Sequence, residues 1–140
     1  MACDLQMTTD GVLKSKCKTK IFKFASGKDH FCPEPFLAGF AGNAMDIMTV
    51  VDFYHNPELY DRAPKTKNFS GLILTQSGRI FIFYDSPGNW LTVDSKYHSI
   101  GSGSLTALGA MHMGATPKQA VQAAMKVDPL TGMGTKVIKL

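Results

Sequence analysis

The order of predicted elements indicates an α+β protein in which helices lie outside two packed sheets. Three observations predict this class: strand-like alternation of polar and apolar residues near the N-terminus, a β-rich hairpin in the middle of the chain, and two adjacent helical patterns near the C-terminus. The sequence contains no internal repeat and no linker. Residues 1–140 are therefore expected to form a single domain.

The first part of the chain is predicted to consist mainly of strands. Met1–Asp4 is short and apolar, like the tail of a strand, and Asp10-Gly11 is a turn signal. Residues 18–24 alternate between polar and apolar side chains, as a half-buried strand does. A loop over residues 26–29 then leads to a second apolar strand, Phe36–Phe40.

A helix is predicted to follow this strand. Asn43 is a good N-cap, and Asp46 lies where a carboxylate interacts favourably with the positive end of the helix dipole. Asn56-Pro57 ends the helix, and Glu58–Ser70 is expected to be a loop. Apolar residues at three- and four-residue spacing predict one buried stripe, formed by Ala44, Ile47, Met48, Val51 and Tyr54.

Two β-rich runs, Gly71–Thr75 and Arg79–Tyr84, flank a three-residue segment that contains a glycine, and this pattern predicts a hairpin. The two runs are almost continuously apolar, which favours a strand pair covered on both faces. Two further strands are expected, at Trp90–Val93 and at Tyr97–Ile100.

Two helices and a final strand are predicted for the C-terminal part. The first helix covers Leu105–Met113, and the second begins at Thr116 with the pattern of a capping box. Asp128-Pro129 ends the second helix, and Lys136–Leu140 is expected to be a strand. The apolar face of the second helix is formed by Ala120, Val121, Ala124 and Met125.

The composition favours a soluble globular protein of a reducing compartment. The formal net charge is +4, and alternating lysines near the N-terminus are typical of a solvated strand face rather than of a nucleic-acid reader. The three cysteines form no C-x-x-C pair, and the four histidines lack metal-ligand spacing, so we expect no metal and no cofactor. With no signal peptide and no membrane-length apolar run, a cytoplasmic location is expected.

Four motifs in this order resemble the proteasome β-subunit and HslV family of N-terminal-nucleophile hydrolases. Ala2-Cys3-Asp4 is similar to the family's A-x-D, and Thr19-Lys20-Ile21 to the strand that carries its site lysine. Gly39 to Asp46 is similar to its G-F-A-G-x-x-x-D element. The fourth is a G-S-G-S bend followed by D-x-x-T-G, here Gly101 to Ser104 and then Asp128, Thr131 and Gly132.

The resemblance implies a four-layer αββα sandwich and a peptide-hydrolysing site. In the family an N-terminal threonine attacks the peptide carbonyl, and its own α-amine acts as general base. The resemblance assigns Lys20 to the lysine beside that amine and Asp4 to the carboxylate that holds this lysine. Gly42 would supply an oxyanion N–H, and the hydrogen bonds that support the amine would come from Ser102, Asp128 and Thr131.

The chain departs from the family pattern at two places. Only residues 56–70 are available where larger members carry a second long helix, and compact phage and prophage proteasome-like proteins share that shortening. In addition, the family's first strand, with its catalytic threonine, has no counterpart before Ala2. Removal of Met1 and Ala2 would expose Cys3 as a nucleophile, but strand alternation predicts that Cys3 points away from the site. A Ser/His/Asp triad built on His98 or His112 has no supporting motif.

Three functions remain open at this stage. The natural protein extends upstream and is a threonine peptidase, or the chain is a catalytically silent relative that acts in binding or assembly, for example against a host factor, or it is a structural subunit of a larger particle. If the protein is phage-encoded, its compartment is the host cytoplasm. The chain as given is expected to lack peptidase activity. The short exposed strand at Met1–Asp4 favours a homo-oligomer, with no nucleic-acid or membrane partner.

Overall fold

The protein has a mixed α+β architecture, seen in a computed structural model that describes residues 1–9, 13–26, 32–67 and 69–140. The largest element of this architecture is a five-stranded antiparallel sheet. Its strands follow one another in chain order, although one of the connections contains a helix. They are β4 (Ile21–Phe24), β5 (Phe36–Gly42), β6 (Phe69–Thr75), β7 (Ile80–Tyr84) and β8 (Leu91–Thr92).

The centre of this sheet is formed by β5 and β6, which pair over seven residues from Phe36↔Thr75 to Gly42↔Phe69. Side chains of β6 alternate between buried and half-buried, as the two faces of a strand do. Phe83 of β7 and Ile73 of β6 are fully buried in the main hydrophobic core. The predicted hairpin is confirmed, and its first strand begins two residues earlier than the sequence pattern indicates.

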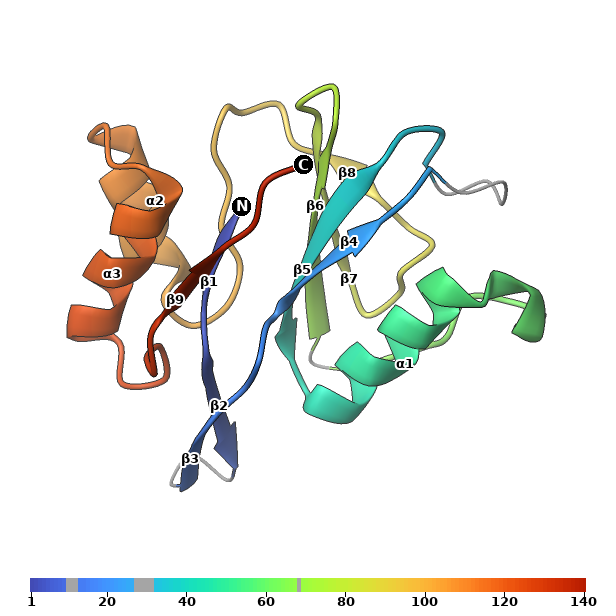
Figure 1. Ribbon diagram of the computed structural model, residues 1–140, viewed down its shortest axis with the longest axis horizontal. Helices are drawn as coiled ribbons and strands as arrows, with labels where there is room; N and C mark the ends of the chain where they lie inside the picture. The colour runs from blue at the N-terminus through green and yellow to red at the C-terminus, as the bar shows by residue number, and fades with distance from the viewer. Residues whose placement is uncertain (10–12, 27–31, 68) are drawn as a thin grey trace.

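The helix α1 (Ala44–His55) covers one face of the five-stranded sheet (Figure 1). Asn43 caps it as predicted, by accepting a hydrogen bond of 2.8 Å from the backbone N–H of Met45. The predicted buried stripe is only partly correct, because Met48 is 59% exposed while Val50 and Phe53 are buried. Val50 packs in the main core with Val51, and Phe53 lies one turn after Val50 on the same side of the helix, so the buried face is turned relative to the expected one.

Two smaller sheets are built mainly from the N-terminal segment. The strand β1 (Ala2–Asp4) pairs antiparallel with β9 (Thr135–Val137), so the two ends of the chain lie side by side. The strands β2 (Gln6–Thr9) and β3 (Leu13–Lys16) form a hairpin that the sequence patterns do not predict. The predicted turn signal Asp10-Gly11 lies between these two strands, outside the described residues.

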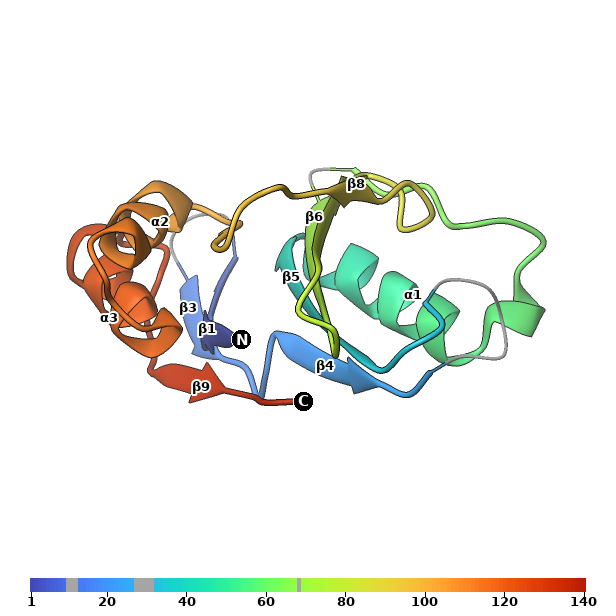
Figure 2. The same ribbon diagram turned by 90° about the horizontal axis from the view of Figure 1, so that it is seen from above.

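Two C-terminal helices pack on each other around a second hydrophobic cluster that includes Ala107, Met111, Ala120 and Ala124. They are α2 (Ser104–His112) and α3 (Pro117–Val127), and α3 begins with the capping box predicted from the sequence. Figure 2 shows these helices on one side of β1 and β9, the five-stranded sheet beyond these strands, and α1 on the far side of that sheet. The predicted α+β class is confirmed.

The segment before α2 differs from the prediction. Tyr97–Ile100 is not a strand, because the sheet ends at β8 and these residues lead the chain across to α2 instead. The aromatic ring of Tyr97 packs edge-on against His112 of α2, with ring centroids 5.9 Å apart. The aromatic residue of this segment therefore packs on the helices. The alternation of polar and apolar residues over 97–100 cannot by itself distinguish helix packing from strand pairing.

Two predicted loops also need comment. The predicted loop at Glu58–Ser70 contains a short 3-10 helix, η1 (Pro57–Leu59), and overlaps the start of β6. The predicted loop at residues 26–29 falls mostly outside the described part of the chain. Among the described residues, none of the helices has the length and hydropathy that crossing a bilayer requires.

Candidate active site

The closest ion pair among the described residues joins two of the residues singled out in the sequence. Asp4 lies at the end of β1, and Lys20 lies immediately before β4. The Lys20 Nζ atom is 2.9 Å from Asp4 Oδ1 and 3.1 Å from Oδ2, so both carboxylate oxygens accept from one ammonium. The side chains of Lys20 and Asp4 are only 22% and 14% exposed, respectively, which limits screening of the pair by solvent.

Both partners are fixed by further contacts. The backbone carbonyl of Lys20 accepts from the N–H of Phe40, which ties this residue to β5. Asp4 Oδ2 accepts from the backbone N–H of Gln6 at 2.9 Å and from that of Gly132 at 3.2 Å. The carboxylate therefore connects β1 to the loop after α3. A charged acceptor with several N–H donors of this kind is held more firmly than a surface carboxylate.

A second cluster of predicted site residues surrounds Asp128, at the C-terminal end of α3. Asp128 Oδ2 accepts hydrogen bonds from the hydroxyls of Ser102, at 2.6 Å, and Thr131. Its other oxygen accepts from the N–H of Leu130 at 3.0 Å. Gly103 permits this arrangement, because a Cβ atom at that position would lie 2.8 Å from the Thr131 hydroxyl oxygen.

The two clusters are joined through the chain itself, since Thr131 of the second cluster is followed directly by Gly132, which donates to Asp4. The buried side chain of Gln6 reinforces this junction by donating from Nε2 to the backbone carbonyl of Pro129 at 2.8 Å. The sequence analysis did not identify Gln6 as important. A polar residue at the start of a strand carries no local signal of a partner 123 positions away.

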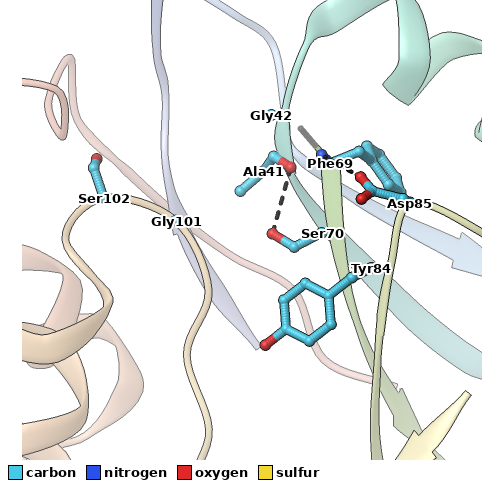
Figure 3. Close-up of a pocket in the computed structure, with 8 residues that line it drawn as sticks. All are labelled: Ala41, Gly42, Phe69, Ser70, Tyr84, Asp85, Gly101 and Ser102. Atoms are coloured by element: carbon cyan, nitrogen blue, oxygen red, sulfur yellow. Dashed lines mark hydrogen bonds between the residues drawn. The ribbon is translucent and has the colours of Figure 1, made fainter. Parts of the chain in front are cut away.

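Gly42 lies at the end of β5, in a conformation that few residues other than glycine adopt, with φ of 128°. It lines a cavity of about 410 Å³ together with Ser102. Gly101 brings these two segments together, because a Cβ atom there would already contact the Cβ of Ala41 at 3.4 Å. Figure 3 shows Ser102 and Gly101 on one side of this cavity and Gly42 on the other. Hydrogen bonds and the Thr131–Gly132 peptide bond thus link five of the six predicted site residues, which are Lys20, Asp4, Thr131, Asp128 and Ser102, and the sixth, Gly42, lines the same cavity as Ser102.

Two reactive groups at the start of the chain, the Met1 α-amine and the Cys3 thiol, have contacts of their own. The α-amino group of Met1 donates to the backbone carbonyl of Ile138 at 2.9 Å, and burial lowers its pKa. The Cys3 thiol contacts the backbone N–H of Lys20, so it lies nearer the ion pair than strand alternation alone indicates. Burial nevertheless raises the pKa of this thiol, and this disfavours the thiolate that a nucleophile requires.

The arrangement offers an ammonium, carboxylates, hydroxyls and a glycine amide, which are the groups used in acid–base and acyl-transfer chemistry. Among the described residues, no three His, Cys, Asp or Glu side chains are grouped so that they could hold a metal ion. The remaining polar residues of the cavity, Ser70, Tyr84 and Asp85, were not identified from the sequence. Ser70 and Tyr84 lie in strands, and Asp85 follows one. The residue pattern of a strand indicates which side chains are buried, but not which of them line a cavity.

No protein-family model matches the sequence, and a sequence search of curated proteins also finds no match. Solved structures do match. BPH of Thiobacillus denitrificans aligns with a TM-score of 0.69 and 17% identity, over 96% of this chain and 88% of that chain. Anbu, the ancestral beta-subunit, from Yersinia bercovieri aligns with a TM-score of 0.67 and 14% identity, over 96% and 73%. The helical assembly of the Anbu complex from Pseudomonas aeruginosa contains a chain with a TM-score of 0.65 and 12% identity, over 96% and 73%.

These matches cover almost the whole chain at identities at which they establish the fold alone. The protein has the fold of BPH and of Anbu, the ancestral beta-subunit, and the resemblance identified in the sequence is confirmed at the level of the fold.

Proposed function

We propose that the cluster around Asp4 and Lys20 is the site of an amide-bond hydrolase of the N-terminal-nucleophile type, set in a four-layer αββα sandwich. The observation that carries this proposal is the ion pair of 2.9 Å between Lys20 and Asp4, together with its connection through Gly132 to Asp128. A partly buried ammonium that is held in one position can disfavour protonation of an amine next to it, because the two charges would repel.

In this proposal the nucleophile is the hydroxyl of an N-terminal threonine on a strand placed before Ala2. The α-amine of that threonine accepts the hydroxyl proton, and the ammonium of Lys20 disfavours protonation of the amine by like charge. The backbone N–H of Gly42 stabilises the developing oxyanion, a contribution typically worth about 10²–10³ in rate. Ser102 and Thr131, both bound to Asp128, orient the amine.

The polypeptide of residues 1–140 is expected to be inactive by itself. Its first residue is Met1, whose side chain carries no nucleophile and whose α-amine is already bonded to Ile138. The first experiment therefore assays this polypeptide on fluorogenic peptides with and without an epoxyketone-type inhibitor. Turnover that the inhibitor abolishes would contradict the expected inactivity.

The second experiment supplies the nucleophile. A strand of about ten residues that begins with threonine after processing is fused before Ala2, and hydrolysis and covalent labelling by the inhibitor are measured. Labelled protein, with turnover that falls by at least about a hundredfold in Lys20→Ala, is the expected result. The matched controls replace the new threonine with alanine and, separately, Lys126 with alanine, since Lys126 is an exposed lysine of α3. A correctly processed, folded fusion without labelling would contradict the proposal.

An alternative proposal is a non-catalytic binding or assembly protein, which includes a structural subunit of a larger particle. It is favoured by the free edge of β1, whose one described partner strand is β9. The matching Anbu complex from Pseudomonas aeruginosa forms a helical assembly. Association that persists in a Lys20→Ala variant without any hydrolytic activity would favour this alternative.

A further inference from the structure

The cavity beside Gly42 extends beyond the residues assigned to catalysis. Its volume is about 410 Å³, and one wall is formed by Ser70 of β6 with Tyr84 and Asp85 at the end of β7. Figure 3 shows the Tyr84 ring beside Ser70, and the Asp85 carboxylate next to the backbone nitrogen of Phe69. None of these residues takes part in the proposed reaction. They form a wall within the same cavity as the Gly42 amide.

Asp85 is held in an unusual backbone conformation. Its φ angle is +52°, in the left-handed region that costs energy for residues other than glycine. Three hydrogen bonds fix it there: its N–H donates to Phe69 O at 3.2 Å, its carbonyl accepts from Thr66 N–H at 3.0 Å, and its Oδ1 accepts from Phe69 N–H at 3.2 Å. The position of the carboxylate at the cavity is therefore set by the ends of β6 and β7.

The wall presents a carboxylate next to an aromatic ring. Among the described residues that line the cavity, Asp85 is the acidic residue, and no lysine, arginine or histidine is present to neutralise it. The Tyr84 side chain is 55% exposed and presents an aromatic ring. An apolar and aromatic surface that ends in a carboxylate complements a long side chain with an aliphatic stem and a cationic head.

We propose that the Tyr84–Asp85 wall is a specificity site for a lysine or arginine side chain next to the scissile bond. This inference rests on the proposed function, because it takes Gly42 as the place where the reacting carbonyl lies. The cationic head pairs with Asp85, the aliphatic stem lies against the Tyr84 ring, and the backbone of the substrate passes between Gly42 and Ser102. The substrate class is then basic peptides or unfolded basic protein segments.

Direct binding tests the inference without any catalysis. The 140-residue chain is titrated with N-acetyl-lysine methylamide and with N-acetyl-norleucine methylamide, which has the same stem without the charge, while backbone amide shifts of Gly42, Gly101 and Ser102 are followed by NMR. We expect shifts at these amides and a preference of about threefold to fivefold for the lysine compound, the size usual for an exposed charge pair. The preference should weaken with added salt.

The decisive variant is Asp85→Asn. Asparagine tolerates a positive φ and keeps a side-chain oxygen for the Phe69 N–H, so the fold is preserved while the charge is removed. The lysine preference should disappear in this variant and persist in Asp61→Asn, which makes the same charge change at an exposed position.

Two outcomes would overturn the inference: equal binding of both compounds by the unmodified chain, or a lysine preference that survives Asp85→Asn. Neither outcome bears on hydrolysis, which the threonine-strand fusion tests separately.

Discussion

Asp4 is the residue on which the geometry of the candidate site depends most. Its carboxylate accepts from Lys20 and from the backbone N–H groups of Gln6 and Gly132, and it is 14% exposed. Asp4→Ala leaves these donors without their acceptor in a partly buried place, so we expect a loss of about 1–3 kcal/mol in the free energy of unfolding. Urea unfolding followed by circular dichroism measures this loss.

The control is Asp94→Ala, because Asp94 is an exposed residue for which a change within about 0.5 kcal/mol is expected. Lys20→Met should fall between the two variants, since it removes the ion pair and leaves both backbone donors bonded to Asp4. An Asp4→Ala protein as stable as the unmodified chain would show that these contacts contribute little to folding.

The sequence identified Asp4 and Lys20 only through the order of four motifs, and hydrogen bonds link this pair through Gly132 and Thr131 to Asp128 and Ser102. It did not identify Gln6 or Asp85. Gln6 bonds to a carbonyl 123 positions away, and Asp85 lines the cavity because of a positive φ angle that its neighbours impose. Local pattern carries no information about contacts of either kind.

At the scale of elements, the turn of the β6–β7 hairpin is held by a residue from another part of the chain. Glu34, just before β5, accepts from the Ser77 hydroxyl and N–H, both at 2.7 Å, and forms an ion pair of 3.0 Å with Arg79. These bonds, first that of the Ser77 side chain and then that of Arg79, lower the pKa of Glu34 from its ordinary 4.5 to about 2. The carboxylate thus fastens the turn to the start of β5.

A carboxyl group whose pKa is depressed in the folded state stabilises that state above its unfolded pKa. The contribution of Glu34 should therefore be complete above pH 4.5 and be lost as the pH falls towards 2. We predict that Glu34→Gln loses less stability on acidification through this window than the unmodified chain does. Thermal unfolding at several pH values measures the difference, with Glu58→Gln as the matched control. Parallel pH profiles for Glu34→Gln and the unmodified chain would contradict the prediction.

Elements whose signals are local were predicted well, and elements that depend on partners were not. The caps of α1 and α3 were read from Asn43 and Thr116, because a cap is formed by residues within one turn. Tyr97–Ile100 was predicted as a strand, but it is not one, and Tyr97 packs on the C-terminal helices instead. The β2–β3 hairpin was missed because its residues are largely polar. Without an alternation of polar and apolar side chains, the sequence gives no sign that the two strands pair.

At the scale of the whole molecule, the two ends of the chain form one small sheet with an edge that no described strand covers. Met1 and Ile138 exchange both backbone hydrogen bonds, at 2.9 and 3.0 Å. In an antiparallel pair the next residue along the strand, Ala2, therefore directs its N–H and carbonyl groups away from β9. Among the described strands none pairs with that side of β1, and an unpaired strand edge is a template for another chain.

We predict that the 140-residue chain forms homo-oligomers in which this edge is paired, and that Ala2→Pro shifts them towards monomer. Proline removes the outward N–H of residue 2 without affecting the bonds that β1 makes with β9, because those bonds belong to Met1 and Cys3. Size-exclusion chromatography with light scattering gives the mass, and circular dichroism checks that the fold is retained. Ala2→Ser keeps the N–H and should assemble like the unmodified chain. A monomeric unmodified protein, or unchanged assembly of folded Ala2→Pro, would show that this edge does not mediate association.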